Sequence, residues 1–155
     1  MIETTKQITV FLENKPGRLA KALTQLAQEK VNIIALTVMD KHEHGVLRLV
    51  ADDPLKAIQV MQTLNTPFTE TEVLLVELRN QPGALANVCS ALAAEHINID
   101  YAYCSSGGRN GRVFGIFKVP HADKAKNILN VPFNNSARRR PERRPARKQR
   151  SYQIK

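Results

Sequence analysis

The chain has 155 residues, of which 43% are hydrophobic and 24% are charged, proportions typical of a soluble globular protein. No segment has the apolar length of a membrane span or the pattern of a secretory signal, so a soluble cytoplasmic protein is the expected class. Cys89 and Cys104 have neither metal-binding nor redox spacing, and both are expected to be buried structural thiols.

The net charge of +9 is distributed unevenly along the chain. Residues 138–155 hold nine Lys and Arg side chains and one acid, while the preceding 137 residues hold 14 basic and 13 acidic side chains. The globular part is therefore close to neutral. The excess of positive charge belongs to the tail, so the chain as a whole is not expected to be a basic nucleic-acid-binding protein.

The first half of the chain predicts strands and helices in alternation. Residues 7–13 alternate as a strand does, "NKPG" at 14–17 interrupts them, and apolar residues recur at helical spacing over 19–27. Residues 31–39 and 46–50 predict two further strands. Asp53 followed by Pro54 predicts the start of a second helix, and "TPFT" at 66–69 predicts a short fourth strand.

The second half repeats this order. Residues 14–33 and 80–99 align without a gap, and ten of the twenty positions are identical. Residues 71–78 predict a strand, 83–95 a helix, 97–104 and 112–119 two strands joined by "SSGGRNG", and 120–129 a helix. The repeat ends near Asn135, and the arginine- and proline-rich tail beyond it is expected to be disordered.

The order β-α-β-β-α-β in each copy predicts an α+β fold of two ferredoxin-like modules packed side by side. The expected modules are residues 1–69 and 70–135, with residues 136–155 as a basic tail. Each module would have an open sheet edge, and pairing the copies edge to edge would extend the sheet.

The repeated N-x-P-G sequence stands where a strand turns into a helix. Proline and glycine favour a tight turn, and the helix that follows offers unpaired N–H groups to an anion. Asn14 and Asn80 add a donor and an acceptor next to the turn. These groups suit a zwitterionic amino acid, although the alternative that the asparagines cap the turn stays open.

"ENKPGRLAKALTQLAQEKVNI" and "RNQPGALANVCSALAAEHINI" resemble the first loop, helix and strand of ACT domains, amino-acid-sensing modules typified by the C-terminal domain of phosphoglycerate dehydrogenase. The resemblance covers about residues 6–134. It implies paired modules that bind a small effector at their junction and regulate a separate partner.

The resemblance also implies the site residues. Asn14, Lys15 and Gly17 would face Asn98, and Asn80, Gln81 and Gly83 would face Asn32. The ligand-binding set is completed by the neighbouring Pro16, Arg18, Leu19, Pro82, Ala84 and Leu85. Serine-binding members carry a histidine where this chain has Leu12 and Leu78, so one polar ligand contact is missing. Lys15 and Arg18 make the first site the more cationic one, which favours an anionic group there.

Other interpretations are weaker. His42 and His44, with Asp40 and Glu43, have a spacing that could chelate a metal, and "SSGGRNG" lacks the pattern of a phosphate-binding loop. No nucleophile and base can be assembled, so no catalytic activity and no cofactor are expected. The expected partners are a small-molecule effector, a separate enzyme or regulator, and a second copy in a homodimer, with no membrane. The alternatives are binding of nucleic acid or an acidic partner through residues 138–150, a structural dimerisation module, and a tail produced by a change of reading frame.

Overall fold

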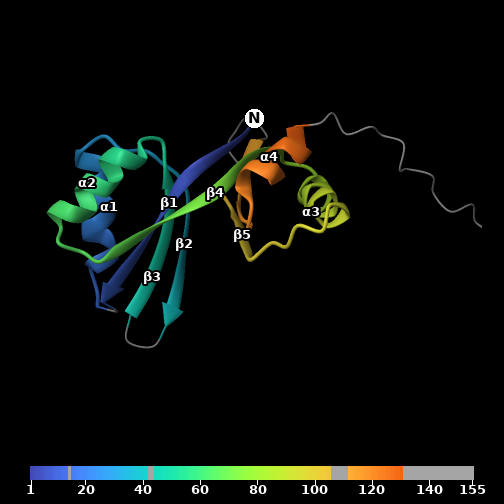
Figure 1. The fold of residues 1–155 in the computed structure, drawn as a ribbon. Helices are drawn as coiled ribbons and strands as arrows, with labels where there is room; N and C mark the ends of the chain where they lie inside the picture. The colour runs from blue at the N-terminus through green and yellow to red at the C-terminus, as the bar shows by residue number, and fades with distance from the viewer. Residues whose placement is uncertain (14, 42–43, 106–111, 131–155) are drawn as a thin grey trace, which may run out of the picture.

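The computed structural model describes residues 1–13, 15–41, 44–105 and 112–130, with the backbone alone at residues 40, 41 and 44 (Figure 1). Strands and helices alternate in the order that the sequence predicts. The elements are β1 (Ile2–Glu13), α1 (Arg18–Gln28), β2 (Ile33–Lys41), β3 (His44–Ala51), α2 (Pro54–Thr63), β4 (Phe68–Arg79), α3 (Ala84–Ala94), β5 (Tyr101–Cys104), β6 (Arg112–Lys118) and α4 (Ala122–Asn130).

All six strands belong to one antiparallel sheet in the order β2-β3-β1-β4-β6-β5. The two copies of the repeat therefore meet at the centre of the sheet, where β1 pairs with β4 from Ile2↔Val76 to Val10↔Phe68. The expectation of an α+β fold made of two ferredoxin-like units in an extended sheet is confirmed.

The two central strands are each longer than the repeat predicts. The short strand expected at the end of the first copy and the strand expected to open the second are one continuous strand, β4. The expected boundary between residues 69 and 70 falls inside it. The first half of β4 flanks β1 as the fourth strand of the first unit, and its second half pairs with β6.

The N-terminal half of β1 does the same for the second unit. Residues 2–6 lie beside Glu72–Val76 of β4, in the position that a fourth strand of the second unit would take. The start of the chain thus supplies the fourth strand of the second unit, which the sequence alone leaves undecided. Residues 131–155, which follow α4, lie outside the described residues.

The two halves are related by an approximate twofold axis. β1 spans 2–13 and β4 spans 68–79, a constant offset of 66 residues. Lys6 pairs with Glu72, its own counterpart at that offset, so the axis passes through this pair. Here β1 has no β3 partner, since that ladder begins at Gln7, and β4 has no β6 partner, since that ladder begins at Leu74. The sheet is two strands wide at Thr5↔Val73 and Lys6↔Glu72.

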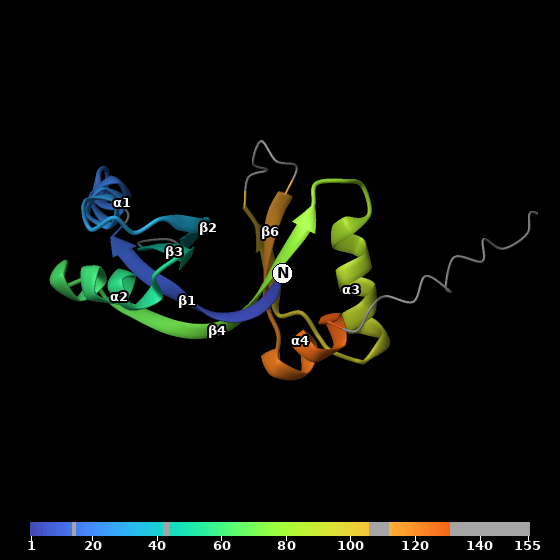
Figure 2. The same ribbon diagram turned by 90° about the horizontal axis from the view of Figure 1, so that it is seen from above.

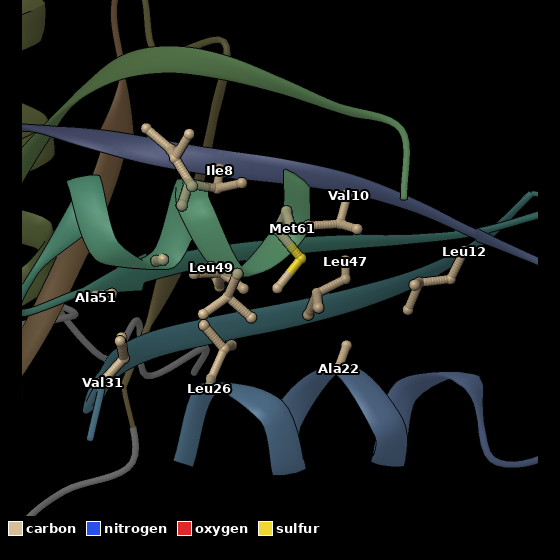
Figure 3. Packing of buried hydrophobic residues seen from close by; sticks show 13 residues of the cluster. Ile8, Val10, Leu12, Ala22, Leu26, Val31, Leu47, Leu49, Ala51 and Met61 are labelled. Atoms are coloured by element: carbon tan, nitrogen blue, oxygen red, sulfur yellow. The ribbon is translucent and has the colours of Figure 1, made fainter. Parts of the chain in front are cut away.

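Each half has its own core beneath its two helices. In the first half, Leu26 of α1 and Met61 of α2 are fully buried against Ile8, Leu47 and Leu49 (Figure 3). In the second half, Leu92 of α3 and Leu129 of α4 pack against alternate residues of β4 and β6. Alternation along the strands places these residues on the helix-covered face of the sheet.

The opposite face of the sheet is concave and partly closed. Figure 2 shows the two ends of the sheet turned toward each other with the helices outside, and β2 contacts both β5 and β6. A third cluster on this inner face joins Ala35 and Val50 of the first half to Val73, Leu75 and Ile116 of the second. The strong coiling of the long strands β1 and β4 thus brings the two ends of the sheet into contact.

Local signals explain how the helices begin and end. Asp53 accepts a hydrogen bond from the Lys56 N–H at 3.0 Å, with Pro54 in the first turn, so the predicted N-cap of α2 is confirmed. Two residues after the ends of α1 and α3, the equivalent residues Lys30 and His96 are in the left-handed region, with φ 59° and φ 55°. None of the described helices is long and apolar enough to cross a membrane.

One expectation about burial is wrong. Cys89 is half-buried, but Cys104 is exposed instead of buried. Its counterpart in the repeat, Val38, is also 49% exposed. Both residues belong to the outermost strands of the sheet, β2 and β5. An apolar match in the repeat therefore does not require burial.

Candidate functional site

The first turn joins β1 to α1 through a left-handed glycine. Gly17 is the N-cap residue of α1, with φ 84° and ψ −11°, a region that residues with a Cβ rarely adopt. The Lys15 N–H donates to the Glu13 carbonyl at 2.7 Å, and the Arg18 N–H donates to the Lys15 carbonyl at 3.3 Å. Because glycine has no side chain to cap the helix, its first N–H groups gain no partner from the N-cap residue.

The second turn has the same backbone. Gly83 is the N-cap of α3, with φ 86° and ψ −11°. The Gln81 N–H donates to the Arg79 carbonyl at 2.8 Å, and the Ala84 N–H donates to the Gln81 carbonyl at 3.2 Å. A Cβ at either glycine would meet nothing within 4 Å, so the conformation, and not crowding, requires glycine. The repeated Pro-Gly pairs therefore encode one geometry twice.

The side chains around the two turns differ. In the first, the Glu13 carboxylate accepts from Lys15 at 3.2 Å and from Arg18 at 2.7 Å, and the hydrogen bonds from Lys15 and Arg18 lower the pKa of Glu13. In the second, the equivalent of Glu13 is the exposed Arg79. The sequence comparison of Lys15 and Arg18 with Gln81 and Ala84 overlooked Glu13. Once Glu13 is included, the first turn is not the more cationic of the two.

A groove runs beside the first turn. Its volume is about 180 Å³, below the range of about 300–1,000 Å³ that holds drug-sized ligands. It combines the apolar surface of β1 with the Glu13–Arg18 ion pair and with the chain between α2 and β4, and is lined by Phe11, Leu12, Glu13, Arg18, Leu64, Asn65, Thr66 and Pro67. A compact metabolite with charged and apolar parts suits such a surface.

The asparagines that precede the second strand of each copy have local roles. The Asn32 N–H donates to the Asp52 carboxylate at 2.9 Å, and the Asp52 N–H donates to the Asn32 carbonyl at 3.0 Å, which joins the start of β2 to the end of β3. The Asn98 side chain donates to Asp100 at 3.2 Å. Asn98 lies three residues before β5, which is shorter than the strand predicted over 97–104.

Within one chain, the predicted site residues lie in separate places. β1 and β4 are antiparallel, so the first turn and the second turn lie at opposite ends of the β1–β4 ladder. Among the described residues, the hydrogen bonds of Lys15, Arg18, Gln81 and Asn98 stay within their own half of the chain. Pro16, Leu19, Pro82 and Leu85 lie in or next to the turns as expected, whereas Asn14 lies outside the described residues.

The other sequence candidates are only partly covered. His42, Glu43, residues 106–111 and the tail 136–155 lie outside the described residues, as do the side chains of Asp40 and His44. In the remainder of the chain, no three His, Cys, Asp or Glu side chains lie close enough together to hold a metal ion.

A polar cluster on the inner face was not predicted. The fully buried Gln7 donates to Thr9 at 3.0 Å and to the Tyr101 hydroxyl at 2.9 Å, and it accepts from the Tyr103 hydroxyl at 3.1 Å. Burial, and then the neighbouring Tyr101, raise the pKa of Tyr103. A glutamine within a strand pattern is a weak signal, because its partners on β5 follow more than ninety residues later.

The sequence matches the family described as the ACT domain pair over residues 3–135. The crystal structure of protein BT0572 from Bacteroides thetaiotaomicron is similar, with a TM-score of 0.74 and 33% identity over 83% of this chain and 88% of that one. The regulatory subunits of aspartate kinase from Thermus thermophilus, in its ligand-free form, and from Thermus flavus share the fold. Their TM-scores are 0.59 and 0.53, their identities 15% and 16%, and the matches cover 85% and 83% of this chain and 96% and 94% of those chains.

No curated protein matches the chain. The family match covers both copies of the repeat, and the turns, the order of elements and the shared sheet agree with it. ACT domain pairs are regulatory modules that respond to small molecules. The chain belongs to the family of ACT domain pairs.

Proposed function

We propose that this ACT domain pair is a non-catalytic regulator that binds an amino acid or a similar small metabolite at its glycine turns. The observation that carries the proposal is the duplicated geometry of these turns, with Gly17 and Gly83 in the same left-handed conformation at the start of a helix. N–H groups at a helix start favour a carboxylate. Arg79 beside the second turn adds a positive charge, and the groove beside the first adds apolar surface.

The alternative role of the asparagines as helix caps is weaker for the second copy. The N-cap position of α3 belongs to Gly83, three residues after Asn80. The Asn80 side chain is exposed and makes no hydrogen bond to any other described residue. An exposed amide without a structural partner is available to a ligand.

Each proposed site consists of a glycine turn of one module and the asparagine that precedes the second strand of another module, Asn32 or Asn98. Because Asn32 and Asn98 lie apart from the turns in one chain, we assign the partner module to a second copy in a homodimer. The outermost strand β2 supports this assignment, since its backbone edge is unpaired in the sheet order and its Leu36 and Val38 are 40% and 49% exposed. A ligand that bridges two copies would favour the dimer by its difference in affinity for the two states. The separate enzyme or regulator would respond to that change.

The experiment is a thermal-shift screen of the full chain against the twenty amino acids and common metabolic acids. A ligand at one hundred times its dissociation constant adds about 2.7 kcal/mol, which corresponds to a rise in Tm of roughly 5–10 °C. Asn80→Ala is expected to abolish the shift while leaving the Tm of the free protein unchanged.

Asn127→Ala is the matched control, since Asn127 is an exposed asparagine on α4, away from both turns. It should keep both the Tm and the ligand-induced shift. If Asn80→Ala lowers the Tm of the free protein as much as it lowers binding, the asparagine has the capping role and the proposed site is wrong.

A further inference from the structure

The inner face of the sheet carries a row of polar side chains that crosses four strands. In the register of the sheet, Arg48 of β3 is the direct partner of Thr37 on β2 and of Thr9 on β1, and Thr9 is in turn the partner of Thr69 on β4. Directly opposite residues point to the same face with their Cβ atoms about 4.5–5.5 Å apart. Arg48 is therefore flanked in the sheet by a threonine on each side.

The Arg48 guanidinium packs against an aromatic ring. Its guanidinium carbon lies 3.9 Å from the centroid of the Tyr101 ring, which comes from β5 at the other end of the sheet. Among the side chains that the structure describes, no carboxylate pairs with Arg48, although Lys6, Lys15, Arg18, Lys56 and Arg112 all have acidic partners. A ring over one face of a guanidinium leaves the in-plane N–H donors available.

The hydrogen bonds that Gln7 donates leave the Thr9 and Tyr101 hydroxyls able to donate to another partner. Its Nε2 group donates to both Thr9 Oγ1 and Tyr101 Oη, so each of these oxygens acts as an acceptor there and keeps its own proton for another partner. Since Thr9 stands next to Arg48 and Tyr101 covers it, these protons and the guanidinium belong to one patch. A patch of donors with one fixed positive charge is complementary to a carboxylate.

Apolar side chains adjoin this patch on the same face. Two residues further along β1, on the same face, the next row consists of Met39, Val46 and Phe11, which are direct partners across β2, β3 and β1. Phe11 and Met39 are 39% and 38% exposed although they belong to the concave face. The surface therefore offers a cation with hydroxyl donors beside an accessible apolar strip.

We propose that this inner face binds a small carboxylic acid that carries an apolar group and no α-ammonium. Arg48 takes the carboxylate in a bidentate pair, the Thr9 and Tyr101 hydroxyls donate to it, and Phe11 and Met39 contact the apolar group. Among the described side chains of the patch there is no carboxylate to accept from an ammonium group, so an amino acid is the poorer ligand. This site shares Phe11 with the groove beside the first turn, but it uses neither glycine turn and does not depend on the function proposed for them.

The probe is 3-phenylpropanoate, titrated into the full chain by calorimetry beside phenylalanine and 3-phenylpropanamide. Phenylalanine differs from the probe by the α-ammonium, and the amide differs by the loss of the negative charge. Binding of 3-phenylpropanoate, and much weaker binding of the other two compounds, is the expected result. The chain has no tryptophan, and two of its three tyrosines lie on this face, so a change in tyrosine fluorescence should accompany binding.

Three variants identify the site. Arg48→Gln should weaken 3-phenylpropanoate binding by about tenfold or more, since hydrogen bonds to charged groups are the strong ones. Tyr101→Phe keeps the ring over Arg48 and removes one donor, so it should cause a smaller loss. Arg18→Gln is the matched control, an arginine of the first turn whose loss should leave this affinity unchanged while it disturbs the site proposed there.

The outcomes separate the proposals. Absence of 3-phenylpropanoate binding at millimolar concentration, or an affinity unchanged by Arg48→Gln, overturns the inner-face site and leaves the glycine turns unaffected. Equal binding of the acid and its amide also overturns it, because the carboxylate would then have no role. Should Arg48→Gln fail to fold, Arg48→Lys keeps the charge without the bidentate geometry, and wild-type-like affinity of that variant contradicts the proposal.

Discussion

Residues 2–6 are expected to determine the stability of the second half of the chain. The Glu77 N–H donates to the Met1 carbonyl, and the Phe11 N–H donates to the Pro67 carbonyl, at 2.8 and 2.9 Å. Hydrogen-bonded pairs alternate along an antiparallel ladder, so Thr5 exchanges bonds with Val73 whereas the Thr4 N–H points away from β4. Thr5→Pro removes a ladder donor, and Thr4→Pro removes an N–H on the side where β1 has no partner among the described strands before Gln7.

The cost of Thr5→Pro follows from the burial of its partner. Val73 is fully buried, and an unpaired buried carbonyl costs about 1–3 kcal/mol. For a chain of this size that lowers Tm by roughly 3–12 °C, while Thr4→Pro should cost less than about 1 kcal/mol because proline is tolerated on the open side of a strand.

Circular dichroism melts and hydrogen exchange measure the two effects. Thr5→Pro should remove amide protection from residues 72–76 and from β6, more than sixty residues away in sequence, while α1 and β3 keep theirs. Equal destabilisation by Thr4→Pro and Thr5→Pro, or loss of protection confined to the first half, would refute the shared-strand reasoning.

Two further predictions concern the second half. Gly115→Ala would place a Cβ 2.8 Å from the Phe117 ring and should lower the free energy of unfolding, measured by chemical denaturation, by about 1–3 kcal/mol. Gly45→Ala, whose Cβ would meet only one atom at 3.9 Å, should leave the free energy of unfolding nearly unchanged. Equal losses in the two variants would contradict this account. Hydrogen bonds from Arg112 and from the N-terminal ammonium lower the pKa of Glu77 below its ordinary 4.5. The stabilisation by ionised Glu77 is therefore present above pH 4.5 and is lost as the pH falls through the lowered pKa. In thermal melts, the Tm of the wild type should exceed that of Glu77→Gln at neutral pH. This difference in Tm should vanish in acid.

The elements could be predicted because their signals are local. Gly17 and Gly83 have the same conformation, as the aligned Pro-Gly pairs indicate. Asp53 followed by Pro54 predicts the start of a helix. The approximate twofold symmetry follows from a repeat without gaps. Such features depend on a few consecutive residues, and most of them occur in both copies of the repeat.

The joining of the halves could not be predicted in the same way. Whether residues 68–79 form one strand or two depends on how β1 is placed, and β1 lies at the other end of the sequence. The inner-face patch likewise combines Gln7, Arg48 and Tyr101, three residues with no common spacing. The curl of the sheet brings them together, and neither hydrophobic pattern nor turn chemistry specifies that curl.

The two-strand width of the sheet at Lys6 and Glu72 has a mechanical consequence. Elsewhere three or more strands resist bending together, but here β1 and β4 are the only strands of the described sheet, beside an open cleft of about 350 Å³ whose lining includes Lys6, Glu70 and Glu72. Twisting this ribbon changes the angle between the helix pairs without disturbing either core. Contacts across the inner face, such as that of Arg48 with Tyr101, oppose the twist, so a molecule bound between them would set the angle at which both halves are presented to a partner.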